Sequence, residues 1–266
     1  WDLHKRIALF VLERAGSNGA SLVLGFMLTA AVISMWVMNT ATTIMLLPIG
    51  LAVVTVVKET VKGLSEKETE NFQLSLLLGI AYGATIGGMS TLIGTGPNGM
   101  LAAFMADNYD LDISFIDWMK VGVPLSAIML PSSWFVLTRI IYPVRFKTSE
   151  ETRTLLSSMK EELGEFQGPE VKVFMVFLLT ALCWMLRTVL DDLPGLGGLS
   201  DAGIAMISAM LLFLLPSGDK ETKGPLLEWE DAQKNVPWGL LVLFGGGLSL
   251  ANAVQSTGLA VWIGNL

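Results

Sequence analysis

The sequence predicts an all-α polytopic membrane protein, and three observations carry this prediction. Its 266 residues are 52% hydrophobic and only 15% charged, whereas about 25% of the residues of a soluble domain are charged. The apolar residues fall in long continuous runs, which is typical of membrane-buried helices. The charged residues, with a net charge of −7, gather between these runs and indicate no nucleic-acid partner.

The chain begins with an amphipathic segment that is followed by a hairpin. Residues 1–18 are predicted to form a helix on the membrane surface, because apolar side chains recur at helical spacing beside Lys5 and Arg6. Residues 19–57 are mainly apolar apart from a break at 39–43, and no polar loop divides them. A re-entrant hairpin with its tip inside the membrane fits this stretch better than two full spans, which remain the alternative.

Residues 73–106 are predicted to form one transmembrane helix with a break inside it, from Ser90 to Gly99. The apolar part after the break is too short to span a membrane alone, so two half-helices share a single crossing. A helix broken in hydrocarbon leaves peptide groups unpaired, and each unpaired group costs several kcal/mol. Such a break persists where protein or a bound solute satisfies those groups.

The remaining elements follow from the same pattern of apolar runs and polar connections. Residues 118–141 are predicted to form a transmembrane helix, and residues 142–170 a cytoplasmic connecting arm. Residues 171–266 hold further transmembrane helices. Arg139 and Arg187 lie near the ends of spans, so their side chains are expected to reach the membrane surface.

The basic residues of the loops alternate along the chain. Loops 58–72, 142–170 and 217–235 carry three, four and three Lys or Arg residues, whereas loops 107–117 and 191–201 carry none. Under the positive-inside rule the three basic loops are cytoplasmic. This alternation requires the hairpin to return to its own side and the broken helix to cross once.

The two breaks have the chemistry of half of a solute and cation site. A helix that begins at Asn39 or near Thr95 presents free N–H groups and the positive end of its dipole, which suit a carboxylate. Unwound carbonyls, with the hydroxyl of Ser34 and the amide of Asn39, are hard oxygen donors that suit Na⁺. Neither break contains an ionisable side chain. The sequence also offers no nucleophile–base pair, so we expect a secondary carrier and not an enzyme.

Two competing interpretations of these motifs are weaker. Ser and Thr in apolar helices often only hydrogen-bond to the preceding turn, but this does not account for two motifs at two topological breaks. Residues 94–99 match G-x-G-x-x-G, yet a dinucleotide site needs a preceding strand in a βαβ unit, and here the preceding segment is a membrane helix.

The residues of both breaks resemble the signatures of the divalent anion/sodium symporter family. The stretches that carry the resemblance are Ser34-Met35-Trp36 with Asn39-Thr40-Ala41-Thr42-Thr43, then Gly87-Gly88-Met89-Ser90-Thr91-Leu92-Ile93-Gly94-Thr95-Gly96-Pro97-Asn98, and a third stretch from Trp229 to Gly247. The resemblance covers nearly the whole chain.

The resemblance implies a carrier for a small di- or tricarboxylate such as succinate or citrate. It implies an elevator-type movement of a transport domain that includes residues 19–57 and 73–106, in a homodimer embedded in the lipid bilayer of the cell membrane. The chain would correspond to the first half of an inverted-repeat transporter and the start of its second half, a scaffold that begins at residue 171. The other half of the site would then lie outside this chain.

The resemblance also implies roles for individual residues of the breaks. These are Asn39, Thr40 and Thr95 for the substrate carboxylate; Ser34, Met38, Asn39 and Gly94 for a sodium ion; and Thr91, Pro97 and Asn98 as supporting residues.

Met38 departs from the family pattern, because symporters of the family usually carry Ser at this position. A Met side chain is a poor Na⁺ ligand, so Met38 would contribute only its backbone carbonyl. Na⁺-coupled symport is the leading expectation. Sodium-independent dicarboxylate exchange within the same family is the alternative, and a channel-like anion pore is the alternative from another class.

Overall fold

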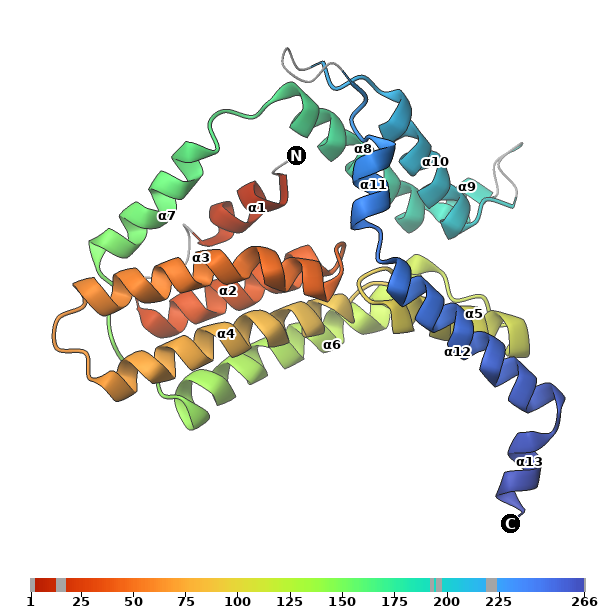
Figure 1. The fold of residues 1–266 in the computed structure, drawn as a ribbon, viewed down its shortest axis with the longest axis horizontal. Helices are drawn as coiled ribbons and strands as arrows, with labels where there is room; N and C mark the ends of the chain where they lie inside the picture. Colours follow the sequence, from red (N-terminus) through yellow and green to blue (C-terminus); the bar gives the residue numbers. More distant parts are fainter. Residues whose placement is uncertain (1–2, 13–17, 192–193, 195–197, 219–223, 266) are drawn as a thin grey trace. The chain divides into compact units, whose positions relative to one another are not determined.

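The chain folds as an almost entirely helical protein, seen in a computed structural model that describes residues 3–12, 18–191, 194, 198–218 and 224–265 (Figure 1). These residues contain no β-strand, only two isolated bridges. With several strongly apolar helices, the predicted class of an all-α polytopic membrane protein is confirmed. The chain divides into two compact units, Trp1–Ala209 and Met210–Leu266.

The first unit contains most of the helices. They are α1 (Leu3–Leu12), α2 (Gly19–Ser34), α3 (Asn39–Thr60), α4 (Glu66–Gly88), α5 (Gly96–Tyr109), α6 (Phe115–Phe135) with its π-helical continuation η1 (Val136–Ile141), α7 (Glu150–Glu162), α8 (Gly168–Met185), α9 (Arg187–Asp191) and most of α10 (Asp201–Leu214). Within the described residues, three helices are long and apolar enough to cross a membrane, namely α3, α6 with η1, and α8.

The second unit is smaller and is described separately. Its helices are α11 (Trp229–Asn235), α12 (Trp238–Ser256) and α13 (Leu259–Gly264). An antiparallel bridge between Pro216 and Pro225 closes the connection before α11. The ring of Trp229 lies 6.3 Å from that of Phe213 at the end of α10.

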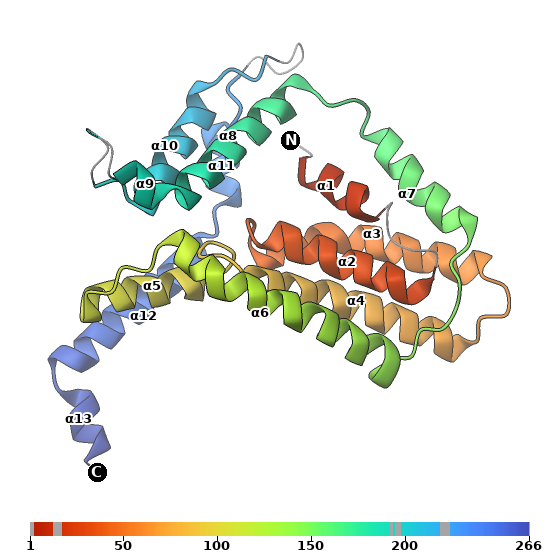
Figure 2. The same cartoon turned by 180° about the vertical axis from the view of Figure 1, so that it is seen from behind.

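Helices α2, α3, α4 and α6 lie side by side and form the main core of the first unit (Figures 1 and 2). Gly79, Gly83 and Gly87 recur every fourth residue on the face of α4 that meets α2. A Cβ at Gly83 would lie 2.5 Å from the carbonyl oxygen of Met27, and one at Gly87 would overlap the backbone of Ala31. The two helices therefore touch backbone to backbone, as small residues allow in membrane proteins.

Both ends of the α2–α3 hairpin lie at the same end of the first unit. Gly19 donates its N–H to the carbonyl oxygen of Phe146 at 3.0 Å, and Thr60 and Ser149 share a hydroxyl–hydroxyl hydrogen bond of 2.6 Å. The tip of the hairpin instead lies beside the end of α4, after which α5 continues for 14 residues, or about 21 Å at 1.5 Å per residue. Helix α3 alone is long and apolar enough to span a membrane, so the re-entrant hairpin, with two full spans as its alternative, stays a prediction.

The amphipathic helix and the connecting arm pack on the protein and on each other. α1 forms within the predicted segment 1–18, of which residues 1–2 and 13–17 lie outside the described part. It buries Ala8, Leu9 and Leu12 in the main core, and α7 covers the same region with Leu155, Leu156 and Met159.

Arg6 joins α1 to the end of α7 and the start of α8. Its guanidinium donates to Glu170 Oε1 at 2.9 Å and to the carbonyl oxygens of Leu163, Gly164 and Glu165 at 2.7–2.8 Å. The Arg6 and Glu170 side chains are only 13% and 4% exposed. A buried carboxylate that loses its partner is strongly destabilising.

Arg6→Ala is therefore expected to lower the free energy of unfolding by about 3 kcal/mol, because it removes the guanidinium partner of Glu170 Oε1 and the donor to three carbonyl oxygens. Thermal unfolding of the purified full-length protein measures the effect. Arg145→Ala is the matched control, since Arg145 is exposed and has no ion pair among the described residues. Equal shifts for the two variants would contradict a structural role for this contact.

Candidate functional site

The first break lies at the tip of the hairpin, four residues earlier than expected. Helix α2 ends at Ser34 and α3 already begins at Asn39, so Met35–Met38 are the non-helical residues and 39–43 are helical. The prediction of an interruption was correct, and its position at 39–43 was wrong. Met38 takes an extended ψ of 141° before α3, and no side chain caps the helix. The first N–H groups of α3 therefore face outward from a helix start without a side-chain acceptor.

The second break separates α4 from α5. Helix α4 ends at Gly88 and α5 begins at Gly96, so the helix resumes before Gly99, where the break was expected to end. Thr95 adopts extended backbone angles as the cap and makes no side-chain capping bond, and Pro97 occupies the first turn. Pro suits this position because its missing N–H would have no helical partner there.

The two breaks meet at Asn39. Its side-chain amide lies 2.6 Å from Ser34 Oγ, 3.2 Å from the Ala84 carbonyl oxygen and 3.3 Å from the Gly94 carbonyl oxygen. With the amide nitrogen facing these oxygens, all three accept hydrogen bonds. With the amide oxygen facing them, four oxygens converge, and the Ser34 hydroxyl donates to the amide oxygen at 2.6 Å.

Close backbone approach brings these groups together. A Cβ on Gly94 would lie 2.9 Å from the carbonyl oxygen of Ser34 and would overlap the carbonyl oxygen of Gly88. Thr91 donates its hydroxyl to the carbonyl oxygen of Met35 at the hairpin tip. Thus the structure brings Ser34, Asn39 and Gly94 together.

Thr91 and Asn98 satisfy the backbone of the second break. The Asn98 amide, which is buried, donates to the Gly88 carbonyl at 2.9 Å and to the Thr91 carbonyl at 2.7 Å. Gly94 donates its N–H to Thr91 Oγ1 at 3.1 Å. These bonds compensate the carbonyls that the break frees, which is how interrupted membrane helices stay ordered.

The remaining site residues lie at the surface of this arrangement. Met38, Thr40 and Pro97 are exposed and Thr95 is partly exposed. The hydroxyls of Thr40 and Thr95 are therefore accessible beside the starts of α3 and α5.

Helix α6 braces the second break with side chains that the sequence reasoning missed. Ser126 donates to the Ile86 carbonyl oxygen and accepts from Ser90 Oγ, both at 2.8 Å, and the Trp118 indole donates to the Met89 carbonyl oxygen at 3.0 Å. The polar side chain of Ser126 inside the apolar run 118–141 was the feature of the sequence that could have indicated this contact.

Thr42 is a second missed residue. Its hydroxyl is buried and has no hydrogen-bond partner among the described residues. It lies three residues after Asn39, on the same face of α3. A buried hydroxyl without a partner costs about 1–3 kcal/mol, which bound water or solute would recover.

The donor set fits a hard monovalent cation and a carboxylate. Neutral oxygens of the backbone, a hydroxyl and an amide line the junction, and no titratable side chain occurs in residues 34–43 or 88–98. Among the described residues no group of three His, Cys, Asp or Glu is placed to hold a metal ion. Such a set suits Na⁺, and the uncapped starts of α3 and α5 suit an anion.

Comparison with known proteins gives consistent matches along the chain. Residues 1–266 match the family described as the sodium:sulfate symporter transmembrane region. The chain is 37% identical over 266 residues to the sodium-dependent dicarboxylate transporter SdcS of Staphylococcus saprophyticus, and 35% identical to the protein of that name from Staphylococcus aureus strain USA300. Each match covers 99% of this chain and 51% of the relative. The chain therefore spans about half the length of these relatives.

Proposed function

Because the chain belongs to the sodium:sulfate symporter family, as its two signatures predicted, we propose that the full-length protein is a secondary carrier for a small di- or tricarboxylate. The family and the named relatives are transporters, in agreement with the expectation of a carrier and not an enzyme. We propose dicarboxylates as the leading substrate class, because the names of the relatives include that class.

The observation that carries this proposal is the contact between the two breaks at Asn39. Two helix starts without side-chain caps and a cluster of neutral oxygens meet where membrane helices are interrupted. In the proposal, Asn39, Thr40 and Thr95 bind the substrate carboxylate. Na⁺ would be held by Ser34, the Met38 carbonyl, Asn39 and Gly94, and would neutralise charge beside the carboxylate. The rest of the site would come from residues outside this chain.

The proposal includes the movement, assembly and orientation of the carrier. Residues 19–57 and 73–106 would move elevator-fashion against a scaffold that starts near residue 171. The carrier would be a homodimer in the cell membrane, with loops 58–72, 142–170 and 217–235 on the cytoplasmic side. The contact of the acidic segment after α5 with Arg187 supports a common side for loops 107–117 and 191–201.

Uptake of labelled succinate by the full-length protein in proteoliposomes tests the proposal. Uptake that needs an inward Na⁺ gradient supports symport, which the names of the relatives favour. Uptake with choline in place of Na⁺ that requires unlabelled internal succinate supports the exchanger. Non-saturable uptake without counter-stimulation would indicate a pore, and a panel of citrate, malate and sulfate identifies another anion if succinate is not carried.

Met38→Ser is expected to lower the Na⁺ concentration for half-maximal uptake about fivefold, since a hydroxyl ligand contributes about 1 kcal/mol. Met38 as a whole residue is 37% exposed, so little packing is lost. Met38→Ala serves as the control, because it removes the thioether without adding an oxygen. Identical Na⁺ dependence of the Ser and Ala variants would contradict an ion site at this position.

A further inference from the structure

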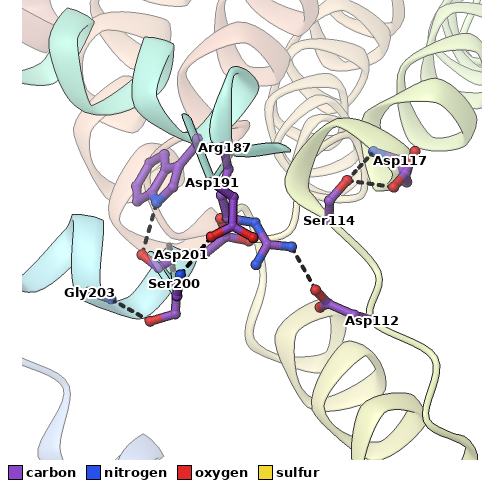
Figure 3. A network of polar contacts seen from close by, with 10 residues as sticks. Asp112, Ser114, Asp117, Arg187, Asp191, Ser200, Asp201 and Gly203 are labelled. Carbon is purple, nitrogen blue, oxygen red and sulfur yellow. Dashed lines mark hydrogen bonds and ion pairs between the residues drawn. The ribbon is translucent and has the colours of Figure 1, made fainter. Parts of the chain in front are cut away.

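Arg187 forms an ion-pair network with carboxylates of two other segments of the first unit (Figure 3). Its Nη2 donates to Asp112 Oδ2 at 2.8 Å, and its Nε lies 3.3 Å from Asp201 Oδ1. Asp112 belongs to the connection between α5 and α6, whereas Asp201 begins α10. Arg187 thus pairs with carboxylates of two different segments, which the sequence did not predict. Its expected reach to the membrane surface stays a prediction.

Apolar side chains, among them several aromatic rings, form the contact beside this ion pair. Trp36 at the hairpin tip lies edge-on to Phe177 of α8, with ring centroids 5.1 Å apart, and Phe115 of α6 stacks on Trp184 of α8 at 5.2 Å. Between the described parts of 18–149 and 173–209, Arg187–Asp112 is the single hydrogen-bonded link. These apolar contacts carry no charge, whereas the hydrogen bond between Arg187 and Asp112 at 2.8 Å is charge-assisted and depends on the position of both partners.

If the hydrogen bond between Arg187 and Asp112 breaks, the Arg187 guanidinium still has a carboxylate beside it at the start of α10. Asp201 still faces Arg187, and the main-chain oxygen of Asp201 accepts a 3.0 Å hydrogen bond from the Trp184 indole. The Arg187 side chain is only 17% exposed, whereas that of Asp112 is 73% exposed. Asp112 can therefore leave into solvent at small cost, and Arg187 keeps a carboxylate partner.

We propose that the Arg187–Asp112 ion pair is a latch, which holds the broken helix α4–α5 in one position against α8–α10 and opens when that helix moves during transport. This inference rests on the proposed carrier function. An ion pair at the rim of an apolar contact biases the balance between two positions without fixing either one, as a switch between two states requires.

Asp112→Asn in the full-length protein tests the latch, because it removes the charge and keeps the size of the side chain. Asp110→Asn is the matched control. Asp110 is exposed, two residues away and in the left-handed conformation at φ 51°, which Asn also tolerates. Asp112→Glu keeps the carboxylate and is the rescue variant. Substitution of Arg187 is less informative, since it would also leave Asp201 without its partner.

The readout is the distance between spin labels on cysteines placed at Asp107 and Met206, two exposed positions on α5 and α10. Cys183 is replaced by Ser beforehand, because it lies four residues from Arg187. We expect the labels to report two distances, one of which is that of this structure. Asp112→Asn should lower the ratio of the population at this distance to the other population about fivefold, a change at the lower end of typical couplings between states. Asp110→Asn and Asp112→Glu should match the parent protein. An unchanged distance distribution in Asp112→Asn would overturn the latch.

Uptake measured on the same proteins separates the two proposals. If the parent protein transports while Asp112→Asn leaves the distances unchanged, the latch fails alone. If the parent protein transports no anion under any gradient, the carrier function fails, whatever the labels report.

Discussion

Asn39→Ala is expected to lower succinate uptake about a hundredfold, which corresponds to about 3 kcal/mol, while the protein still folds and inserts. The Asn39 amide contacts Ser34 Oγ and the carbonyls of Ala84 and Gly94, so its loss removes the group at which both breaks meet. The side chain is half-buried and fills no apolar core position. The largest effect should therefore appear in binding, with a smaller loss of stability from the buried acceptors that lose the amide. Initial uptake rates in proteoliposomes, normalised to inserted protein, measure it.

Asn108→Ala is the matched control for this variant. Asn108 is an exposed residue of α5 whose amide, among the described residues, bonds only to the Phe104 carbonyl of its own helix at 3.0 Å. It should transport like the parent protein. Normal uptake by Asn39→Ala would exclude the two breaks as the binding site.

Gly87→Ala is expected to abolish uptake and to lower the free energy of unfolding by about 2–3 kcal/mol, a typical cost of overpacking. A Cβ at this position would overlap the carbonyl oxygen and Cα of Ala31, which are backbone atoms that cannot rotate away. Helices α2 and α4 must then separate at the level where Ser34 and Gly94 meet. Thermal unfolding and uptake of the same preparation measure both effects.

Gly99→Ala provides the control for a methyl group added elsewhere on the broken helix. Its Cβ would find no atom closer than 3.9 Å, and alanine favours a helix over glycine by about 1 kcal/mol. Gly99→Ala should therefore be at least as stable as the parent protein and should transport normally. A Gly87→Ala protein with unchanged stability would show that α2 and α4 do not need this close approach.

The two interruptions could be predicted from the sequence, because polar and glycine residues seldom cluster inside an apolar run unless the helix is interrupted there. The exact extent of the first interruption could not. The break was expected at 39–43, yet Asn and Thr are favoured at helix starts, and α3 is already helical from Asn39 onward. The turn falls on Met35–Met38, whose apolar side chains gave no local signal.

The partners of individual polar groups were beyond sequence reasoning, since they depend on which helices become neighbours. Ser126 lies 36 residues from Ser90, and Asp112 lies 75 residues from Arg187, yet each pair is in direct contact. Thr91 and Asn98 were recognised as supporting residues from family resemblance. Asn98 donates to two freed carbonyls of the second break, and Thr91 donates to the Met35 carbonyl of the hairpin tip, which gives that role a physical basis.

Equilibrium binding of labelled succinate to the purified full-length protein, with Na⁺ or with choline, decides whether the two breaks together form the substrate site. We expect saturable binding that Na⁺ strengthens, that Asn39→Ala weakens about a hundredfold, and that Asn108→Ala leaves unchanged. Binding to Asn39→Ala with the affinity of the parent protein would contradict this assignment, because the site would then lie elsewhere.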